Sequence, residues 1–195
     1  MKNILALLLV ILLAGCAPAM VKVDSGSKTM GERMTLTLEG AWNQIDARGL
    51  GPAQTWTMEG LPVDQLLIYT GIKNDQAIHG EFRSGTKSFK FRSGMQPDEI
   101  VALYEGMLTR DGSSFRLVRL EPAPFGGGKG FRFEFALTRK VDNVQLSGVG
   151  YAAVSESELF ALVYMAPRLT FFSRHQARVE GIARSALIKT GGKGI

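Results

Sequence analysis

The chain has one cysteine, Cys16, and its position predicts a specific chemical modification. Cys16 follows an unbroken apolar run at 4–13, which comes after a short basic start at Lys2. As a helix, this run would be about 15 Å long, roughly half of a ~30 Å hydrocarbon core. It is too short to span a membrane and has the length of the apolar part of a secretion signal. The small residues Ala14 and Gly15 then stand where a signal peptidase requires slim side chains.

The residues Leu13-Ala14-Gly15-Cys16 resemble the lipobox of bacterial lipoproteins. The resemblance implies diacylglyceryl attachment to the Cys16 sulfur through a thioether, cleavage before Cys16, and acylation of the new amino group. Several fatty chains hold a protein on a membrane, whereas one holds it only marginally. Because Ala17 stands where an aspartate commonly retains lipoproteins at the inner membrane, we expect the periplasmic face of the outer membrane in a Gram-negative source. An ordinary signal with a chance cysteine is the alternative.

Other residues have types that occur in binding or catalytic sites. The glycine-rich segment 124–130 contains Gly-Lys, but Gly130 follows Lys129 where a phosphate-binding loop requires Ser or Thr. A flexible hairpin loop is the better interpretation of this segment. The two histidines, His79 and His175, have no second ligand at metal-binding spacing, so the sequence predicts no metal site. We expect His175 to be a structural residue of a helix and His79 to be solvated in a polar loop.

A serine hydrolase is not favoured, and a carboxylate-based one remains an alternative. Ser84, His79 and Asp75 are the residue types of a catalytic triad, but no Gly-x-Ser-x-Gly motif is present. Two of the many carboxylates can meet in space, as in a glycosidase, and sequence spacing does not test this. We therefore predict no catalytic residues and no cofactor.

Basic residues give a second candidate for a binding surface. Four arginines fall on neighbouring predicted strands: Arg116, Arg119, Arg132 and Arg139. We expect an ordinary sheet surface in which they pair with Glu121 and Glu134. The alternative is a basic face for an anionic partner.

Composition indicates one globular domain after the signal. The 195 residues are 45% hydrophobic and 21% charged, which is typical of a globular protein. A single cysteine excludes disulfides and thiolate metal sites from the domain. The net charge of +5 is modest and permits contact with anionic lipids. The sequence contains no run of basic residues of the kind that indicates nucleic-acid binding.

The hydrophobic pattern predicts a signal peptide at 1–15, a polar tether at 16–33, one domain at 34–189 and a flexible tail at 190–195; the lipobox resemblance implies that the tether is lipidated at Cys16. Within the domain, periodicity predicts two helices, at 97–110 and 171–187. It predicts strands at 34–42, 54–58, 89–91, 114–121, 130–139, 144–155 and 158–166. The segment 61–72 suits either a strand or a short helix, and we prefer a strand. Loops are expected at 43–52 and 122–130.

One predicted strand alternates cleanly. Its apolar residues face one way: Phe131, Phe133, Phe135 and Leu137. The glycines of the next strand, Gly148 and Gly150, leave room for close neighbours. Trp42 and Trp56 are expected in the core.

These elements predict an α+β fold, an antiparallel sheet of about six strands flanked by helices. The order helix, four strands, helix over 97–187, with Val-Tyr-Met-Ala-Pro at 163–167 and Val-Glu-Gly-Ile-Ala-Arg-Ser at 179–185, resembles the C-terminal half of PsbP-like and DcrB-like domains. Such domains usually lack catalytic residues. The element Trp-Thr-x-x-Gly at 56–60 also resembles proteobacterial lipoproteins. The first half of the chain departs from PsbP.

The sequence therefore predicts a non-catalytic envelope lipoprotein that acts as a binding or assembly accessory. Lipidated Cys16 would hold it on the membrane, and an envelope protein or an anionic lipid or glycan would be its partner. One alternative is an envelope hydrolase with converging carboxylates. The other is a carrier of small apolar ligands in a cavity between sheet and helix.

Overall fold

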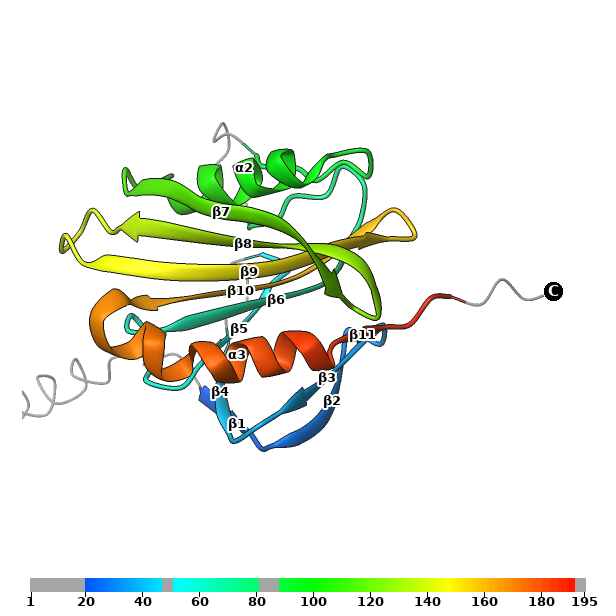
Figure 1. The fold of residues 1–195 in the computed structure, drawn as a ribbon, viewed down its shortest axis with the longest axis horizontal. Helices are drawn as coiled ribbons and strands as arrows, with labels where there is room; N and C mark the ends of the chain where they lie inside the picture. The colour runs from blue at the N-terminus through cyan, green and yellow to red at the C-terminus, as the bar shows by residue number, and fades with distance from the viewer. Residues whose placement is uncertain (1–19, 47–50, 81–87, 192–195) are drawn as a thin grey trace, which may run out of the picture.

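The computed structural model describes residues 20–46, 51–80 and 88–191, and the signal, Cys16, Ser84 and the end of the predicted tail lie outside them. An eight-stranded sheet forms the centre (Figure 1), and each strand pair in it is antiparallel. From edge to edge its strands are β1 (Met20–Val23), β4 (Trp42–Ile45), β5 (Gln54–Thr57), β6 (Gln65–Ile72), β10 (Glu158–Pro167), β9 (Gln145–Ser155), β8 (Gly128–Thr138) and β7 (Ser114–Phe125). A smaller sheet consists of β11 (Leu187–Ile188), β3 (Met34–Leu38) and β2 (Gly26–Met30).

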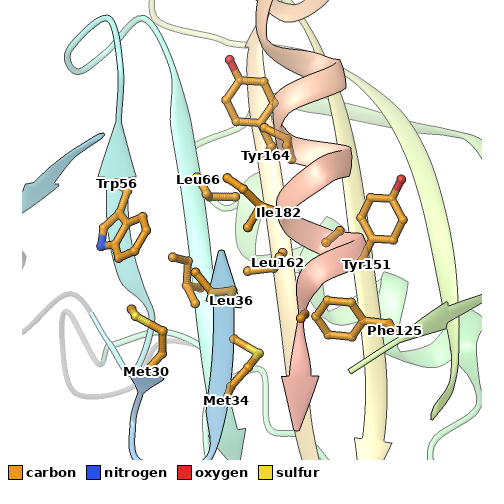
Figure 2. Packing of buried hydrophobic residues seen from close by; sticks show 14 of the residues in the cluster. Met30, Met34, Leu36, Trp56, Leu66, Phe125, Tyr151, Leu162, Tyr164 and Ile182 are labelled. Atoms are coloured by element: carbon orange, nitrogen blue, oxygen red, sulfur yellow. The ribbon is translucent and has the colours of Figure 1, made fainter. Parts of the chain in front are cut away.

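The two helices lie on opposite faces of the large sheet. Helix α2 (Pro97–Leu108) covers one face, and α3 (Ser173–Ser185) covers the other together with the small sheet (Figure 1). A π-helical turn, η1 (Arg168–Phe172), joins β10 to α3. Figure 2 shows the core on the α3 face, in which Leu36 from β3 and Ile182 from α3 pack towards Leu162 of β10. The large sheet therefore has an apolar core on each face.

Glycines in β9 make room for aromatic rings from β8. Phe133 lies opposite Gly150 and Phe135 opposite Gly148. A Cβ added to Gly150 would lie 2.2 Å from the Phe133 ring, and one added to Gly148 would lie 2.1 Å from the Phe135 ring. Tyr104 of α2 stacks on Phe133, with 5.7 Å between ring centroids. The predicted alternation of β8 and the predicted role of these glycines are confirmed.

Helix α2 begins where its sequence indicates. Pro97 occupies its first turn, where a missing N–H costs nothing. The Gln96 N–H donates to Glu99 Oε2 at 2.7 Å, and Asp98 and Glu99 place negative charge at the positive end of the helix dipole. Ile100 and Tyr104 are buried against the sheet. Both predicted helices are confirmed.

The sheet is larger than predicted because short polar segments also pair as strands. Residues 20–30, expected as part of a tether, form β1 and β2, so the folded domain starts before residue 34. β4 occupies 42–45, where a loop was expected. β1 and β2 have few buried side chains, so the pairing of their backbones determines their structure and leaves no hydrophobic pattern in the sequence. β4 does bury Trp42 and Ile45, but two buried residues in a four-residue strand are too few for a recognisable alternation.

Three further segments refine the predicted pattern. The expected loop at 122–130 is mostly strand, because β7 and β8 extend to a two-residue turn at 126–127. β7 contains Pro122 and Pro124, which an edge strand tolerates since only one side of its backbone must pair. Residues 89–91 form only an isolated bridge, Ala77 with Lys90. The segment 61–72 is a strand from residue 65, as preferred.

Candidate functional site

The predicted lipidation site, Cys16, lies outside the described residues, and the nearest described residue is Met20 at the start of β1. Within the described ranges, no helix has both the length and the apolarity needed to cross a bilayer.

The Trp-Thr-x-x-Gly element forms a turn around a buried carboxylate. Asp64 is only 1% exposed and accepts hydrogen bonds from the Thr57 hydroxyl, from the Met58 N–H at 3.0 Å and from the Glu59 N–H at 2.9 Å. Gly60 adopts φ +90° and donates its N–H to Thr57 Oγ1 at 2.8 Å. These contacts satisfy the buried carboxylate, and the role that they indicate for this turn is structural.

The same turn presents Glu59 to helix α3. Glu59 Oε1 lies 2.7 Å from His175 Nε2 and accepts a hydrogen bond from Arg174 Nη1 at 3.2 Å. The hydrogen bond with His175, and then the one with Arg174, lower the pKa of Glu59. His175 is buried and partnered, which confirms its predicted structural role. The three side chains join α3 to the turn at 58–64.

His79 does not lie in solvent, so its predicted solvation is wrong. Its side chain is buried, because residues 77–80 fold back towards 89–91, and its ring centroid lies 5.5 Å from that of Phe89. Its Nδ1 is 2.5 Å from the Gly80 carbonyl oxygen and 3.2 Å from Arg110 Nη1. Asp75 is exposed beside Arg92. The structure does not bring Asp75 and His79 into a hydrogen bond, and Ser84 lies outside the described residues.

Carboxylates do converge at one place, around the Arg132 guanidinium. Arg132 Nη1 is 2.6 Å from Glu134 and 3.4 Å from Glu121, and Arg132 Nη2 is 3.2 Å from Glu180. Its Nε donates to the Tyr151 hydroxyl at 3.0 Å. The Arg132 side chain is 13% exposed. The carboxylates therefore surround a partly buried cation and are already paired with it, so they are not free to act as a catalytic pair on a substrate.

The predicted basic face is largely neutralised. Arg119 lies 2.7 Å from Glu121, and Arg139 lies 2.7 Å from Asp142 while donating to the Pro62 carbonyl at 2.8 Å. Arg116 is exposed on β7. The expectation that these arginines form a paired sheet surface is confirmed for Arg119 and Arg132.

A hollow of about 270 Å³ beside the end of α2 is lined by Asp64, Asp111 and Arg139. The Asp64 oxygens accept the hydrogen bonds of the 58–64 turn. Asp111 Oδ1 accepts the Ser113 N–H at 2.9 Å, and hydrogen bonding to Ser113 lowers the pKa of Asp111. A glycosidase acid needs a carboxyl with a raised pKa. Asp111 has the opposite property.

The glycine-rich segment is a tight hairpin turn. Gly126 and Gly127 have φ of +68° and +83°, as the two central residues of a type I′ turn require. The Gly126 carbonyl accepts the Ile188 N–H of β11 at 2.9 Å, and Lys129 pairs across the hairpin with Pro124. The segment connects β7 and β8 and pairs with β11. The predicted hairpin is therefore confirmed, whereas the flexible loop expected within it is a two-residue turn between paired strands.

An apolar hollow of about 500 Å³ lies at the surface, between the start of α2 and the β7–β8 hairpin. Its lining includes Pro97, Leu120, Pro122 and Phe131. The carrier alternative requires a deeper cavity, between the sheet and helix α2. At that place Tyr104 packs against Tyr69 and Phe133, with 5.6 and 5.7 Å between ring centroids.

Among the described residues, no three His, Cys, Asp or Glu side chains are grouped to hold a metal ion.

Sequence reasoning missed Asp64, Glu59 and Tyr151. Asp64 stands at the start of an apolar strand, four residues after Gly60, and a carboxylate in that context was the available signal. The contacts of Glu59 with α3 and of Tyr151 with Arg132 join residues far apart in sequence, and no local pattern marks them.

Comparisons with known proteins support the fold. No protein-family model and no curated protein matches this sequence significantly. The solution structure of the cyanobacterial PsbP protein CyanoP, from Synechocystis sp. PCC 6803, matches with a TM-score of 0.56 and 11% identity, over 91% of this chain and 99% of that one. LpqN of Mycobacterium tuberculosis, a protein involved in cell envelope biogenesis, matches with a TM-score of only 0.36 and 11% identity, over 91% of this chain and 88% of that one. A TM-score this low is not evidence that the two proteins share a fold. The likeness to CyanoP shows that this chain has a PsbP-like fold.

Proposed function

We propose that this protein is a lipid-anchored protein of the bacterial cell envelope and that its PsbP-like domain acts as a non-catalytic binding or assembly accessory. The observation that carries the proposal is the lipobox at Leu13-Ala14-Gly15-Cys16, directly after a signal-like apolar run. The thioether formed at Cys16 would join the domain to the membrane.

The polar contacts support a non-catalytic role. The histidine and the carboxylates that meet in space, Glu59 with His175 and Glu180 with Arg132, hold elements together. The pKa values of Glu59 and Asp111 are lowered by hydrogen bonds, so both groups are acceptors at neutral pH and poor general acids.

The accessory role requires a partner, and the position of the domain limits its class. An anchored domain meets envelope proteins, lipid headgroups and envelope glycans, and its modest positive charge favours the anionic members of these classes. The side of the membrane and the choice between inner and outer membrane remain part of the proposal, with the outer membrane favoured by Ala17.

Membrane fractionation of cells that produce the full chain tests the anchor. The wild-type protein is expected in the membrane fraction without residues 1–15, whereas Cys16→Ser should either leave the membrane or keep residues 1–15, which shows as a larger mass. A matched control, Ala19→Ser, changes a nearby position to the same residue outside the lipobox and should fractionate as wild type. A Cys16→Ser protein that has lost residues 1–15 and still fractionates as wild type would contradict the anchor.

Crosslinking in intact cells, followed by mass spectrometry, tests the accessory role. Wild type should enrich a reproducible envelope protein, lipid or glycan, and Cys16→Ser should not. Turnover of an envelope polymer by the purified protein would instead support the hydrolase alternative.

A further inference from the structure

The described fold begins close to the predicted lipid anchor. β1 starts at Met20, only four residues after Cys16. Four residues span at most about 14 Å, even when fully extended. The inference below rests on the proposed lipidation of Cys16. If Cys16 is lipidated, the edge of the large sheet is held at the bilayer surface, because the expected 18-residue tether is mostly folded.

The residues at this edge have side chains that suit a membrane interface. Met20 and Val21 are 52% and 60% exposed, although both are apolar. Neighbouring strand residues point to opposite faces, so apolar surface is open on both faces of the edge at the same point. Lys22 follows, with 70% of its side chain exposed, where it forms an ion pair with Asp24 that solvent screens. Apolar side chains beside a lysine are typical of segments that lie in the headgroup region.

The sheet order gives the domain a near edge and a far edge. β1 and β7 are the two edge strands and lie on opposite sides of the molecule (Figure 1). Measured along the twisted sheet, seven strand spacings of about 4.8 Å separate them by roughly 34 Å. β7 also has exposed apolar residues, among them Val118 at 51%.

We propose that the β1 edge docks on the membrane surface, with Met20 and Val21 in the headgroup region, and that β7 faces away from the membrane. The occupant of this surface is the lipid bilayer that carries the anchor. The domain thus has a fixed orientation on the membrane, and its α2 face, its α3 face and its β7 edge are left for other contacts.

Headgroup quenching tests this orientation in the full-length acylated protein. Variants with one added cysteine, Met20→Cys, Val21→Cys and Val118→Cys, are labelled with bimane at that position, since the Cys16 sulfur is blocked by its thioether. The proteins are reconstituted into phosphatidylethanolamine–phosphatidylglycerol vesicles that contain a lipid with a nitroxide on its headgroup. Val118→Cys is the matched control for Val21→Cys, because both replace an exposed valine in an edge strand of the same sheet.

Quenching at positions 20 and 21 should be several-fold stronger than at position 118. Equal quenching at the two edges, or stronger quenching at 118, overturns the docking proposal. Mass spectrometry of the same samples independently determines whether Cys16 is acylated. If Cys16 is acylated and quenching is equal at the two edges, the orientation alone is contradicted. If Cys16 is not acylated, both the proposed anchor and the orientation are contradicted. Near-ultraviolet circular dichroism checks that each labelled variant is folded.

Discussion

At the scale of single residues, buried polar groups in this domain mainly support structure. Asp64 is buried, but its carboxylate accepts hydrogen bonds from a hydroxyl and from backbone N–H groups. Arg132 is a partly buried cation that is paired with Glu121, Glu134 and Glu180. Removing the Asp64 carboxylate leaves its donors without an acceptor inside the fold, which costs more than the hydrogen bonds themselves are worth. The glutamates around Arg132 are partly exposed, so water can replace a lost partner there.

Asp64→Ala should therefore destabilise the domain strongly. The Thr57 hydroxyl and the N–H groups of Met58 and Glu59 would lose their acceptor, and the expected loss in free energy of unfolding is about 3 kcal/mol. Urea unfolding measures it. Asp24→Ala, which removes an exposed aspartate whose ion pair with Lys22 is screened by solvent, should change the stability far less. Equal losses for the two variants would contradict the structural role of Asp64.

Gly150→Ala should also destabilise, for a steric reason. Its Cβ would lie 2.2 Å from the Phe133 ring, and overpacking of this kind typically costs about 1–3 kcal/mol. Gly128→Ala is the matched control in the neighbouring strand, because no atom lies within 4 Å of its added Cβ. Thermal unfolding should separate the two variants. A Gly150→Ala domain as stable as Gly128→Ala would mean that the ring does not lie over this glycine.

At the scale of elements, α3 is attached to the sheet by its apolar stripe and by one polar contact at its start. Val179 and Ile182 are buried against the sheet, while His175 and Arg174 meet Glu59 on the 58–64 turn. The lowered pKa of Glu59 makes this polar contact pH-dependent. A carboxyl whose pKa is lower in the folded state stabilises the fold above its unfolded pKa, and this contribution is lost as the pH falls through the folded value.

Glu59→Gln tests this linkage. The wild type should be more stable than the variant at pH 7, and the difference should shrink as the pH falls below about 4.3, the ordinary pKa of a glutamate. Urea midpoints at pH 7 and pH 3 give the measurement. Glu105→Gln, on the exposed side of α2, is the control for the substitution itself. A wild-type advantage that is as large at pH 3 as at pH 7 would contradict the account.

Elements with strong side-chain periodicity were predictable, and elements defined by pairing were not. Helix α2 and strand β8 follow from apolar spacing, since their buried residues recur every helical turn or every second position. β1 and β2 have mostly exposed residues and exist because their backbones pair with β4 and β3. The turn around Asp64 depends on a buried carboxylate whose hydrogen-bond donors come from neighbouring residues. His79 is buried because residues 77–80 fold back towards 89–91, and the polar composition of this segment gave no sign of that burial.

At the scale of the whole molecule, the large sheet has two different edges. β7 carries Pro122 and Pro124 and a register shift between Leu117 and Arg119, features that discourage pairing with another chain. β1 is short and exposes Met20 and Val21. β7 also exposes apolar residues, Leu117 and Val118, so the two edges differ in their prolines and in their distance from Cys16 rather than in apolarity. If the chain is anchored at Cys16, the membrane covers the β1 edge, and the edge that the prolines protect faces away from it.

The most direct test of this account is the mass of the mature N-terminus, measured on protein purified from membranes. The account predicts that the first residue is Cys16, with diacylglycerol on its sulfur and an acyl chain on its amino group. An N-terminal peptide that retains residues before Cys16, or one that begins elsewhere and contains a free thiol, would contradict it.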